Sequence, residues 1–446
     1  MCAYFSHMHY RKSLLAAASI LALPGLAAAA GLYPTGQTAR SMSLGGVDVT
    51  GGTSPVDAIA NNPASLAAFS RPVAGLSLTY VQSEGTFTNK FNSSASLRES
   101  GIKPGIALAI PLGNGWTAGL GFVPDIAIRA RWNFFDAPGG ADGGTSYGKQ
   151  AHESEIIALR TSAALSWQAT ETLSLGASVG AVYNENRLHG PYTFQSQATL
   201  RTVKTLLDLN TTGTGWGLQT GLNWRPTKDL AVGLSYRSEV RIESNGSARG
   251  DAGRQLDRLG LGGARSDFAY DAGVNNTLPP MASLGAQYQA TARLRLAAQI
   301  DWIGWEQTFD TLVVDLKGGN NDDLNGLTKT RNIHDEIPLN WRDQWVGRIG
   351  AEYALSDSTM LRVGYAYSPS PVPGETLTPL TASISEHTVG IGVGYTRGAW
   401  TWDFAAQADL PHTQSVGTSA LAAGEYNDSS VKIGIWSLGI STRYEF

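Results

Sequence analysis

The chain has 446 residues, of which 52 are glycine, and it carries a formal net charge of -4 with only 16% charged residues. This mild charge gives no indication of a nucleic-acid partner, and a large water-soluble β-protein usually carries more charged residues. Apart from the N-terminal segment, no apolar run approaches the roughly 20 residues of a membrane-spanning helix, so a membrane protein of this sequence has to cross as a closed β-barrel.

Residues 1–29 have the organisation of a secretory signal. Basic residues precede an apolar stretch from Leu14 to Leu23, and an A-x-A cleavage site ends at Ala29. We expect cleavage after Ala29 or a neighbouring residue. The single cysteine, Cys2, lies inside this segment, so we expect the mature chain to have no disulfide, no thiolate chemistry and no thiol-ligated metal.

The following segment, residues 30–72, is dense in small and turn-forming residues and shows no clean alternation. Its most distinctive residues are Gly45, Gly46, Asn62, Pro63 and Ala64. A segment this short cannot bury enough surface to fold alone, so it has to pack against surrounding parts of the chain. We therefore predict an N-terminal hatch, or plug, inside a barrel formed by residues 73–446.

Nearly all of the remaining chain alternates apolar and polar residues with period two, as strands with two different faces do. In the last strand, Trp436, Leu438 and Ile440 point one way, and the small residues between them point the other. Such segments number about fourteen, an even number inside the bacterial range. They start near Val73, Gly101, Trp116, Glu155, Leu173, Gly215, Leu230, Thr277, Arg293, Gln344, Met360, Ser383, Ala399 and Val431. The predicted fold class is an all-β, antiparallel transmembrane barrel.

Charged residues are predicted to face the barrel interior, because a lipid-facing Arg or Lys at mid-bilayer costs about 2–4 kcal/mol. The residues assigned to the inner face on this basis include Arg237, Glu239, Arg241, Glu243, Arg348 and Glu352. An inward arginine such as Arg348 either pairs with an inner carboxylate or contacts a ligand.

Short turns alternate with long connections, the asymmetry expected of an outer-membrane barrel. The long connections are predicted at 126–154, 188–214, 244–276 and 318–343. Two of them carry apolar residues, namely Leu200, Val203, Leu206 and Leu207 at helical spacing, and Leu256, Leu259, Leu261 and Phe268. These residues either pack on each other as a lid or line an apolar groove for a lipid-like ligand, and the two interpretations are compatible.

On these features the chain resembles the FadL/TodX/OMPP1 family, the long-chain fatty acid and aromatic hydrocarbon transporters of the bacterial outer membrane. The resemblance covers the whole mature chain. It rests on Asn62-Pro63-Ala64 after the Gly45-Gly46 region, on the strands Tyr236-Arg237-Ser238-Glu239-Val240 and Gly347-Arg348-Ile349-Gly350, and on Ser370-Pro371-Val372-Pro373. The last strand ends on Phe446, which resembles outer-membrane barrels in which the assembly machinery reads that end.

The resemblance implies a barrel closed by the hatch, with ligand passing from an outer groove to an inner pocket. Hatch movement would then release it through a gap in the wall beside a kinked third strand, which here runs through Pro124 and Asp125. Proline cannot donate to a strand ladder, so Pro124 either kinks this strand or ends it. The groove residues would be Leu200, Val203, Leu207, Leu259 and Phe268.

For a carboxylate ligand, the resemblance suggests Arg187 as the pocket cation, with Arg348 as a further candidate. A second basic position of the family is apolar here, near Leu312, which leaves hydrocarbon ligands open. We expect transport of a long-chain fatty acid or similar molecule, with aromatic hydrocarbon uptake as the alternative. The expected protein is a monomer surrounded by outer-membrane lipid, without cofactor, metal or nucleic acid.

Two other functions are less compatible with the sequence. A general porin has no use for an N-terminal plug. A hydrolase needs a Ser/His/acid constellation, but the histidines that follow the signal lie mostly on loops or strand ends, with no nucleophile motif nearby. We therefore predict that the chain is not an enzyme.

Overall fold

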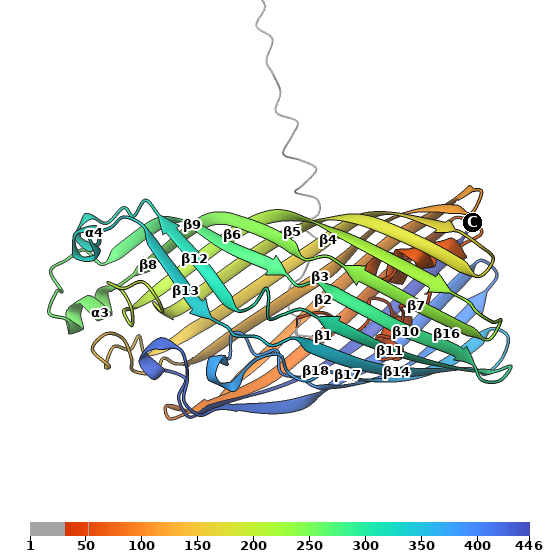
Figure 1. Cartoon of the computed structure of the whole chain (residues 1–446). Coiled ribbons are helices and arrows are strands. Elements are labelled where there is room, and N and C mark those ends of the chain that lie inside the picture. Colours follow the sequence, from red (N-terminus) through yellow and green to blue (C-terminus); the bar gives the residue numbers. More distant parts are fainter. Residues whose placement is uncertain (1–31, 52) are drawn as a thin grey trace, which may run out of the picture.

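A computed structural model describes residues 32–51 and 53–446 of the chain. The predicted signal, with Cys2 and Ala29, lies outside the described residues. Figure 1 shows a long barrel of tilted strands, with the short N-terminal helices inside it near the end that carries the C-terminus. The helices α3 and α4 lie at the opposite end, on the long connections.

Eighteen strand segments form one sheet within the described residues. They are β1 Val73–Asn89, β2 Asn92–Gly113, β3 Trp116–Phe135, β4 Lys149–Gln168, β5 Leu173–Thr193, β6 Lys204–Trp224, β7 Leu230–Arg237, β8 Val240–Asp251, β9 Asp267–Leu278, β10 Met281–Gln289, β11 Leu294–Ile303, β12 Thr311–Lys317, β13 Ile333–Pro338, β14 Gln344–Ala354, β15 Thr359–Tyr367, β16 His387–Arg397, β17 Trp400–Val416 and β18 Ser429–Glu445.

The wall is a closed barrel of fourteen antiparallel strands. Four of these strands are interrupted, so that β7 continues as β8, β9 as β10, β11 as β12 and β13 as β14. The barrel closes because β1 pairs with β2 on one side and with β18 on the other. The predicted strand count and fold class are therefore confirmed.

Several connections that the sequence analysis assigned to loops are strands in the structure. Most of 244–276 belongs to β8 and β9, and β5 and β6 occupy much of 188–214. The apolar residues at helical spacing in 197–209 do not form a helix, because turns at 198–202 lead into β6. Outside the bilayer both faces of a strand can meet water or a loop, so the sequence there has no need of a lipid-facing apolar stripe.

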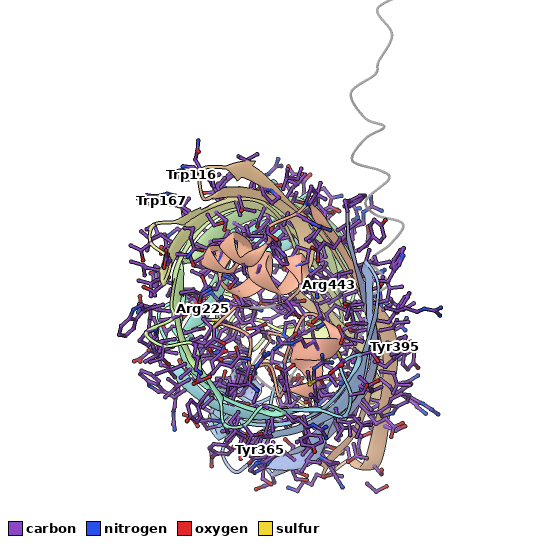
Figure 2. The ribbon with its side chains drawn as sticks, turned by 90° about the vertical axis from the view of Figure 1, so that its right-hand side faces the viewer. Trp116, Trp167, Arg225, Tyr365, Tyr395 and Arg443 are labelled. Carbon is purple, nitrogen blue, oxygen red and sulfur yellow. The ribbon has the colours of Figure 1, made fainter. Side chains whose placement is uncertain are left out.

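The outer face of the barrel is apolar where the strands alternate. Figure 2 looks at the short-turn end and shows Trp116, Trp167 and Tyr395 on the outside of the ring. Trp116 and Trp167 stack with their ring centroids 5.7 Å apart. Aromatic residues at this level are typical of the girdles that outer-membrane barrels place at the bilayer interfaces.

One parity prediction was wrong. Arg237 is buried and faces the lumen, but Arg241 and Glu243 on β8 are exposed. The break between β7 and β8 at residues 238–239 changes the alternation, so that Val240 and Ile242 become the buried residues.

The N-terminal segment lies inside the barrel. Its helices are α1 Ala39–Ser43, α2 Pro55–Asn61 and the 3-10 helix η1 Pro63–Ala68, and they lie within the ring of strands in Figure 2. The sequence starts two of them in the usual way, since Ser54 and Asn62 cap them and a proline follows each cap. No helix in the described parts of the chain is long and apolar enough to cross a membrane.

Four further short helical elements lie on the connections at the far end of the barrel. They are α3 Gly253–Arg258, α4 Asp322–Thr328, η2 Gly374–Thr376 and η3 Ala422–Gly424. At the short-turn end of the barrel, next to the N-terminal segment, a polar basin of about 370 Å³ is lined by residues that include Arg225 and Arg443. Both arginines are labelled in Figure 2.

Buried ion pairs hold the N-terminal segment to the wall. The guanidinium of Arg40 donates to both carboxylate oxygens of Glu352 on β14, at 3.0 and 2.8 Å. Arg362 on β15 reaches the same carboxylate at 2.8 Å and also pairs with Asp403 on β17 at 2.7 Å. Glu352 thus joins the N-terminal segment to neighbouring strands, and it is 4% exposed.

Replacement of Glu352 by glutamine tests how this segment is held. The change leaves Arg40 buried without its counter-ion, a loss of about 3–5 kcal/mol for a broken buried pair. We expect the segment to loosen and the ion conductance of single barrels in a planar bilayer to rise. Glu84→Gln is the matched control, because the Arg98–Glu84 pair spans 3.7 Å and is exposed on both sides. Unchanged conductance in Glu352→Gln would show that this carboxylate does not hold the segment.

Candidate functional site

The wall has a gap between β2 and β3. Their ladder runs from Gly113↔Trp116 to Ile106↔Phe122 and ends there, although both strands continue. Beyond this point β2 pairs only with β1, and β3 pairs only with β4. Two further residues along the same register, Pro104 would face Pro124, and neither has an N–H to donate.

The gap is closed again at the upper ends of the two strands. Arg131 of β3 binds Glu99 of β2 through two hydrogen bonds of 2.8 and 2.9 Å. Asn92 makes side-chain hydrogen bonds of 2.9 Å to both the backbone N–H and the carbonyl of Phe135. We name the unpaired stretch between these contacts and the Ile106↔Phe122 pair the wall gap.

Pro124 does not end the third strand. The β3–β4 register shifts between Pro124 and Ile126, so Asp125 is an extra residue without a partner on β4. A bulge of this kind bends a strand and redirects a side chain. Asp125 is buried in the lumen, 2.6 Å from Arg160 and 3.5 Å from Arg237.

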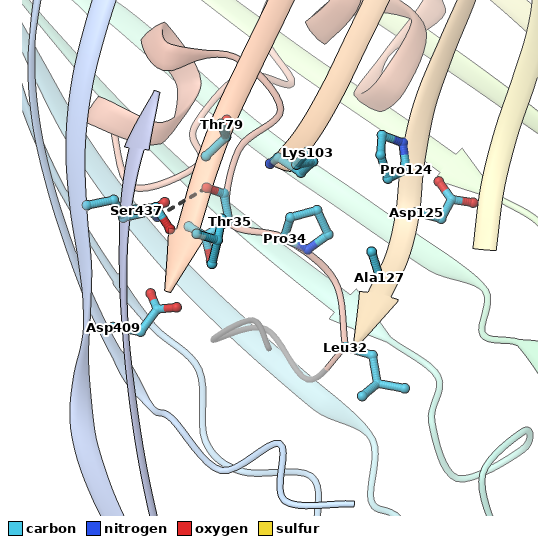
Figure 3. A pocket seen from close by; sticks show the side chains of 12 residues that line it. Leu32, Pro34, Thr35, Thr79, Lys103, Pro124, Asp125, Ala127, Asp409 and Ser437 are labelled. Carbon is cyan, nitrogen blue, oxygen red and sulfur yellow. Dashed lines mark hydrogen bonds between the residues drawn. The ribbon is translucent and has the colours of Figure 1, made fainter. Parts of the chain in front are cut away.

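A small pocket of about 30 Å³ lies on the lumen side of the wall gap, and we name it the inner pocket. Figure 3 shows Pro34 and Thr35 of the N-terminal segment between Asp409 on one side and Pro124 and Asp125 on the other. The segment is bonded to the wall here. Lys103 Nζ donates to the Gly36 carbonyl at 2.5 Å, and the side chain of Gln37 donates to the Pro124 carbonyl at 3.2 Å.

A larger apolar cavity of about 200 Å³, the outer cavity, lies toward the long connections. Its walls come from β3 and β4, the end of β5, the β12–β13 hairpin and the connections after β15 and β17. Phe309 and Trp341 give it an aromatic side, with ring centroids 4.9 Å apart. Leu32 lines both this cavity and the inner pocket, so the two spaces adjoin at the start of the described chain.

A buried lysine ties the connections above the outer cavity together. Lys204 is 0% exposed and lies 2.6 Å from both Asp136 and Glu425. Its ammonium also donates to the Ala137 carbonyl at 2.7 Å. These partners belong to the β3–β4 and β17–β18 connections, and Glu425 lines the cavity. We name this group the lysine lock.

The lysine lock shifts the protonation of its carboxylates. Burial raises the pKa of Asp136 and of Glu425, and the attraction of Lys204 only partly offsets it. Both groups therefore bind protons more tightly when the connections are closed than when they are open to water.

The five distinctive residues of the N-terminal segment are all buried against the wall. The Gly45 carbonyl accepts a 3.0 Å hydrogen bond from Arg348. Gly45 has a φ of 67°, and a side chain there would collide with the backbone of Tyr365. Asn62 caps η1, which starts at Pro63, by accepting from the Ala64 N–H at 3.0 Å.

The two arginines predicted to bind a ligand carboxylate line neither the inner pocket nor the outer cavity. Arg187 is exposed on β5, on the face opposite to the buried Asn184 and Asn186, and it lines neither pocket. Arg348 faces the lumen as predicted, but its partners are Asp301 at 2.5 Å and the Gly45 carbonyl. Arg348 therefore pairs with an inner carboxylate, the first of the two alternatives given for it, and it also holds the N-terminal segment.

The predicted groove residues do not line the outer cavity. Leu200, Leu207 and Phe268 are buried in a separate cluster formed by the extended hairpins, and Val203 packs against it. Leu259 is 45% exposed after α3. In this structure the apolar connections pack on one another, the first of the two interpretations of the sequence.

Most of the residues that line the outer cavity were not predicted from the sequence. Leu380 and its neighbours follow β15, Phe309 and Trp341 lie in breaks beside β12 and β14, and Glu425 lies after η3. The aromatic residues of 303–343 were a usable signal, since aromatic side chains on long connections need a packing partner.

No group of three or more His, Cys, Asp or Glu residues that could hold a metal occurs in residues 32–51 and 53–446.

Comparisons with known proteins add the following relationships. A family model described as outer membrane protein transport protein (OMPP1/FadL/TodX) matches residues 20–446. The long-chain fatty acid transport protein of Escherichia coli K12 is 22% identical over 352 residues, which cover 71% of this chain and 73% of that protein. The long-chain fatty acid transport protein of Salmonella typhi is 21% identical over 341 residues, 71% of this chain and 72% of its own.

Solved structures share the fold. A FadL homologue of Pseudomonas aeruginosa superposes with a TM-score of 0.75 at 18% identity, covering 94% of this chain and all 100% of the other. The toluene transporter TbuX of Ralstonia pickettii gives a TM-score of 0.70 at 20% identity, with 92% and 99% covered.

Replacement of Lys204 by methionine tests the lysine lock. Removing the cation leaves two buried carboxylates unpaired, which costs about 3–5 kcal/mol for a broken buried pair. We expect faster amide hydrogen exchange in residues 136–148 and 417–428, with the rest of the barrel unchanged. Lys317→Met is the control, because Lys317 is exposed at the end of β12. Equal protection in the two variants would exclude the lock.

The raised pKa values of Asp136 and Glu425 predict a pH dependence of loop closure. Since the closed state binds these protons more tightly, their contribution to closure is complete below the ordinary carboxylate pKa and is lost as the pH rises through the raised values. Hydrogen-exchange protection of residues 417–428, corrected for intrinsic rates, should therefore increase on acidification. Glu425→Gln should flatten this profile, and a wild-type profile that falls on acidification would contradict the sign.

Proposed function

The chain belongs to the OMPP1/FadL/TodX family of outer membrane transport proteins, and from this membership and the geometry above we propose how it moves a hydrophobic molecule. The family places the barrel in the outer membrane and makes it a transporter of hydrophobic compounds. In the proposed path, ligand enters the outer cavity from the long-connection end, passes Leu32 into the inner pocket, and leaves sideways through the wall gap into the membrane.

The wall gap is the observation that carries this proposal. An unpaired stretch of two neighbouring strands is costly in lipid, where backbone groups have no water to bond. Here it coincides with both ligand spaces, because Ile128, Arg129 and Ala130 of β3 line the outer cavity and Ala127 lines the inner pocket. A pocket that adjoins a break in the wall supports lateral release.

The N-terminal segment has the role of a hatch in this proposal. Gly36 and Gln37 bind Lys103 of β2 and the Pro124 carbonyl of β3, one on each side of the gap. Ligand that reaches the inner pocket has to displace this part of the segment from the gap. The ion pairs of Arg40 and the bond from Arg348 to Gly45 hold the remainder of the segment in the lumen.

The relatives suggest two ligand classes, because they are named for long-chain fatty acids and for toluene. Long-chain fatty acids are the first expectation from the sequence. Aromatic hydrocarbons are the second, and the rings of Phe309 and Trp341 in the cavity wall favour them, since aromatic rings pack well in offset or edge-to-face geometry.

Cross-linking across the wall gap tests the path. Cysteines replacing Glu99 and Arg131, joined by a reducible thiol cross-linker, would tie β2 to β3 where the native ion pair spans 2.8 Å. We expect cells carrying the cross-linked barrel to lose most of their uptake of labelled oleate or toluene, whichever the wild type transports. Reduction of the cross-link should restore it.

The control pair is Thr88→Cys with Ser430→Cys, on the continuous β1–β18 ladder, where the two hydroxyls are 2.7 Å apart. Cross-linking there should leave uptake unchanged. Undiminished uptake through a barrel cross-linked at the gap would exclude lateral release and favour passage along the barrel axis.

A further inference from the structure

The outer cavity offers almost no charge to a ligand. Of the described residues that line it, only Arg129 and Glu425 are charged, and each is already paired. Arg129 Nε lies 2.5 Å from Glu155 Oε2, and both side chains are largely buried. Arg129 is therefore neutralised by its neighbour on β4 before any ligand arrives.

The lysine lock makes the roof of the cavity negative. It contains one cation, Lys204, and two carboxylates, those of Asp136 and Glu425. Arg129 and Glu155 form one pair, so these groups contain one more carboxylate than cation, and Asp335 behind Tyr192 adds a further carboxylate. A ligand carboxylate would meet repulsion at short range in a poorly hydrated space.

Several neutral polar groups of the cavity wall are already hydrogen-bonded to other protein groups. The Tyr192 hydroxyl donates to Asp335 at 2.6 Å, and the Asn276 amide donates to Asn184 and Asn186 at 2.8 and 2.7 Å. Gln195 donates to the Thr193 carbonyl at 2.7 Å and accepts from the Ala422 N–H at 2.7 Å. A carboxylate in this cavity would have to take these donors from their present partners.

The inner pocket does not compensate. Its one lysine, Lys103, already donates to the Gly36 carbonyl, and the same described lining contains Asp125 and Asp409. Figure 3 shows Lys103, Asp125 and Asp409 around the same stretch of the N-terminal segment. The cations near the wall gap are therefore already engaged, Lys103 by the Gly36 carbonyl and Arg160 and Arg237 by Asp125.

From this charge distribution we infer that the outer cavity selects uncharged hydrophobic molecules and rejects carboxylates of the same size. The ligand class is that of neutral hydrocarbons, alcohols and esters. This inference rests on the proposed function, and it assigns a preference opposite to that of the long-chain fatty acid transporters that the sequence matches. The physical reason is that burying a carboxylate without a free cation carries a desolvation cost that its neutral counterpart, with the same apolar chain, does not have.

A matched pair of ligands tests the selectivity. Octan-1-ol and octanoate have the same carbon chain, and octanoate is ionised at pH 8. We expect the mature, detergent-purified protein to bind octanol at least tenfold more tightly in equilibrium dialysis, with protein-free micelles as the blank. Tenfold corresponds to about 1.4 kcal/mol. Acidification toward the carboxyl pKa should narrow the difference.

Two variants should reduce the preference for octanol, one by adding a positive charge to the cavity wall and the other by removing a negative one. Leu312 lines the cavity, so Leu312→Lys should raise octanoate affinity at least tenfold at pH 8. Leu327→Lys is the control, because Leu327 is 47% exposed and does not line the cavity. Glu425→Gln removes one carboxylate from the cavity wall while Lys204 keeps Asp136, and it should raise the affinity for octanoate relative to the affinity for octanol.

The outcomes separate the two proposals. Wild-type protein that binds octanoate as tightly as octanol would overturn the selectivity and leave the proposed transport intact. Leu312→Lys that binds octanoate no better than Leu327→Lys would overturn it as well. Protein that binds neither molecule, together with full uptake through a barrel cross-linked at the gap, would remove the proposed function and the selectivity with it.

Discussion

The hydrogen-bonding demand of the lipid environment governs this structure, because a strand in a bilayer has no water to bond its backbone. The wall meets the demand by closing β1 onto β18. It departs from it where the β2–β3 ladder ends and, over a shorter stretch, where β6 passes the break between β7 and β8. Pro104 and Pro124 remove two donors from the β2–β3 ladder, and the side chain of Gln37 takes the Pro124 carbonyl from inside. The N-terminal segment is thus part of the wall's own hydrogen bonding.

Filling the lumen imposes a second demand, since charges turned away from lipid are buried and need partners. The N-terminal segment and the wall satisfy each other, as the pairing of Arg40 with Glu352 and the bond from Arg348 to Gly45 illustrate. The connections above the cavity use the same device, with Lys204 between two carboxylates. Such contacts require a specific geometry. Removing one partner leaves the other buried without its counter-charge.

The sequence predicted the wall far better than the site. Alternation along β18 and the spacing of short turns sufficed for the strand count, since both are local. The ligand residues were predicted by resemblance and by apolar content, and they line neither the inner pocket nor the outer cavity. Arg187 sits one position away from the inward-facing Asn186, and a single-residue change of register reverses the face of a strand. Leu207 and Phe268 belong to extended hairpins whose second face is covered by other connections.

By itself, the sequence determined the closed antiparallel barrel, its inward charges over most strands, and an N-terminal segment too small to fold alone. These follow from period-two alternation, the spacing of short turns and the small size of the N-terminal segment, all of which can be read from local sequence. Only the tertiary structure decided that the ladder fails beyond Ile106, that Lys204 meets Asp136 and Glu425, and that Leu32, Trp341 and Leu380 share a cavity. Those contacts join residues far apart in the chain, and their partners depend on strand register and loop packing, which no local pattern encodes.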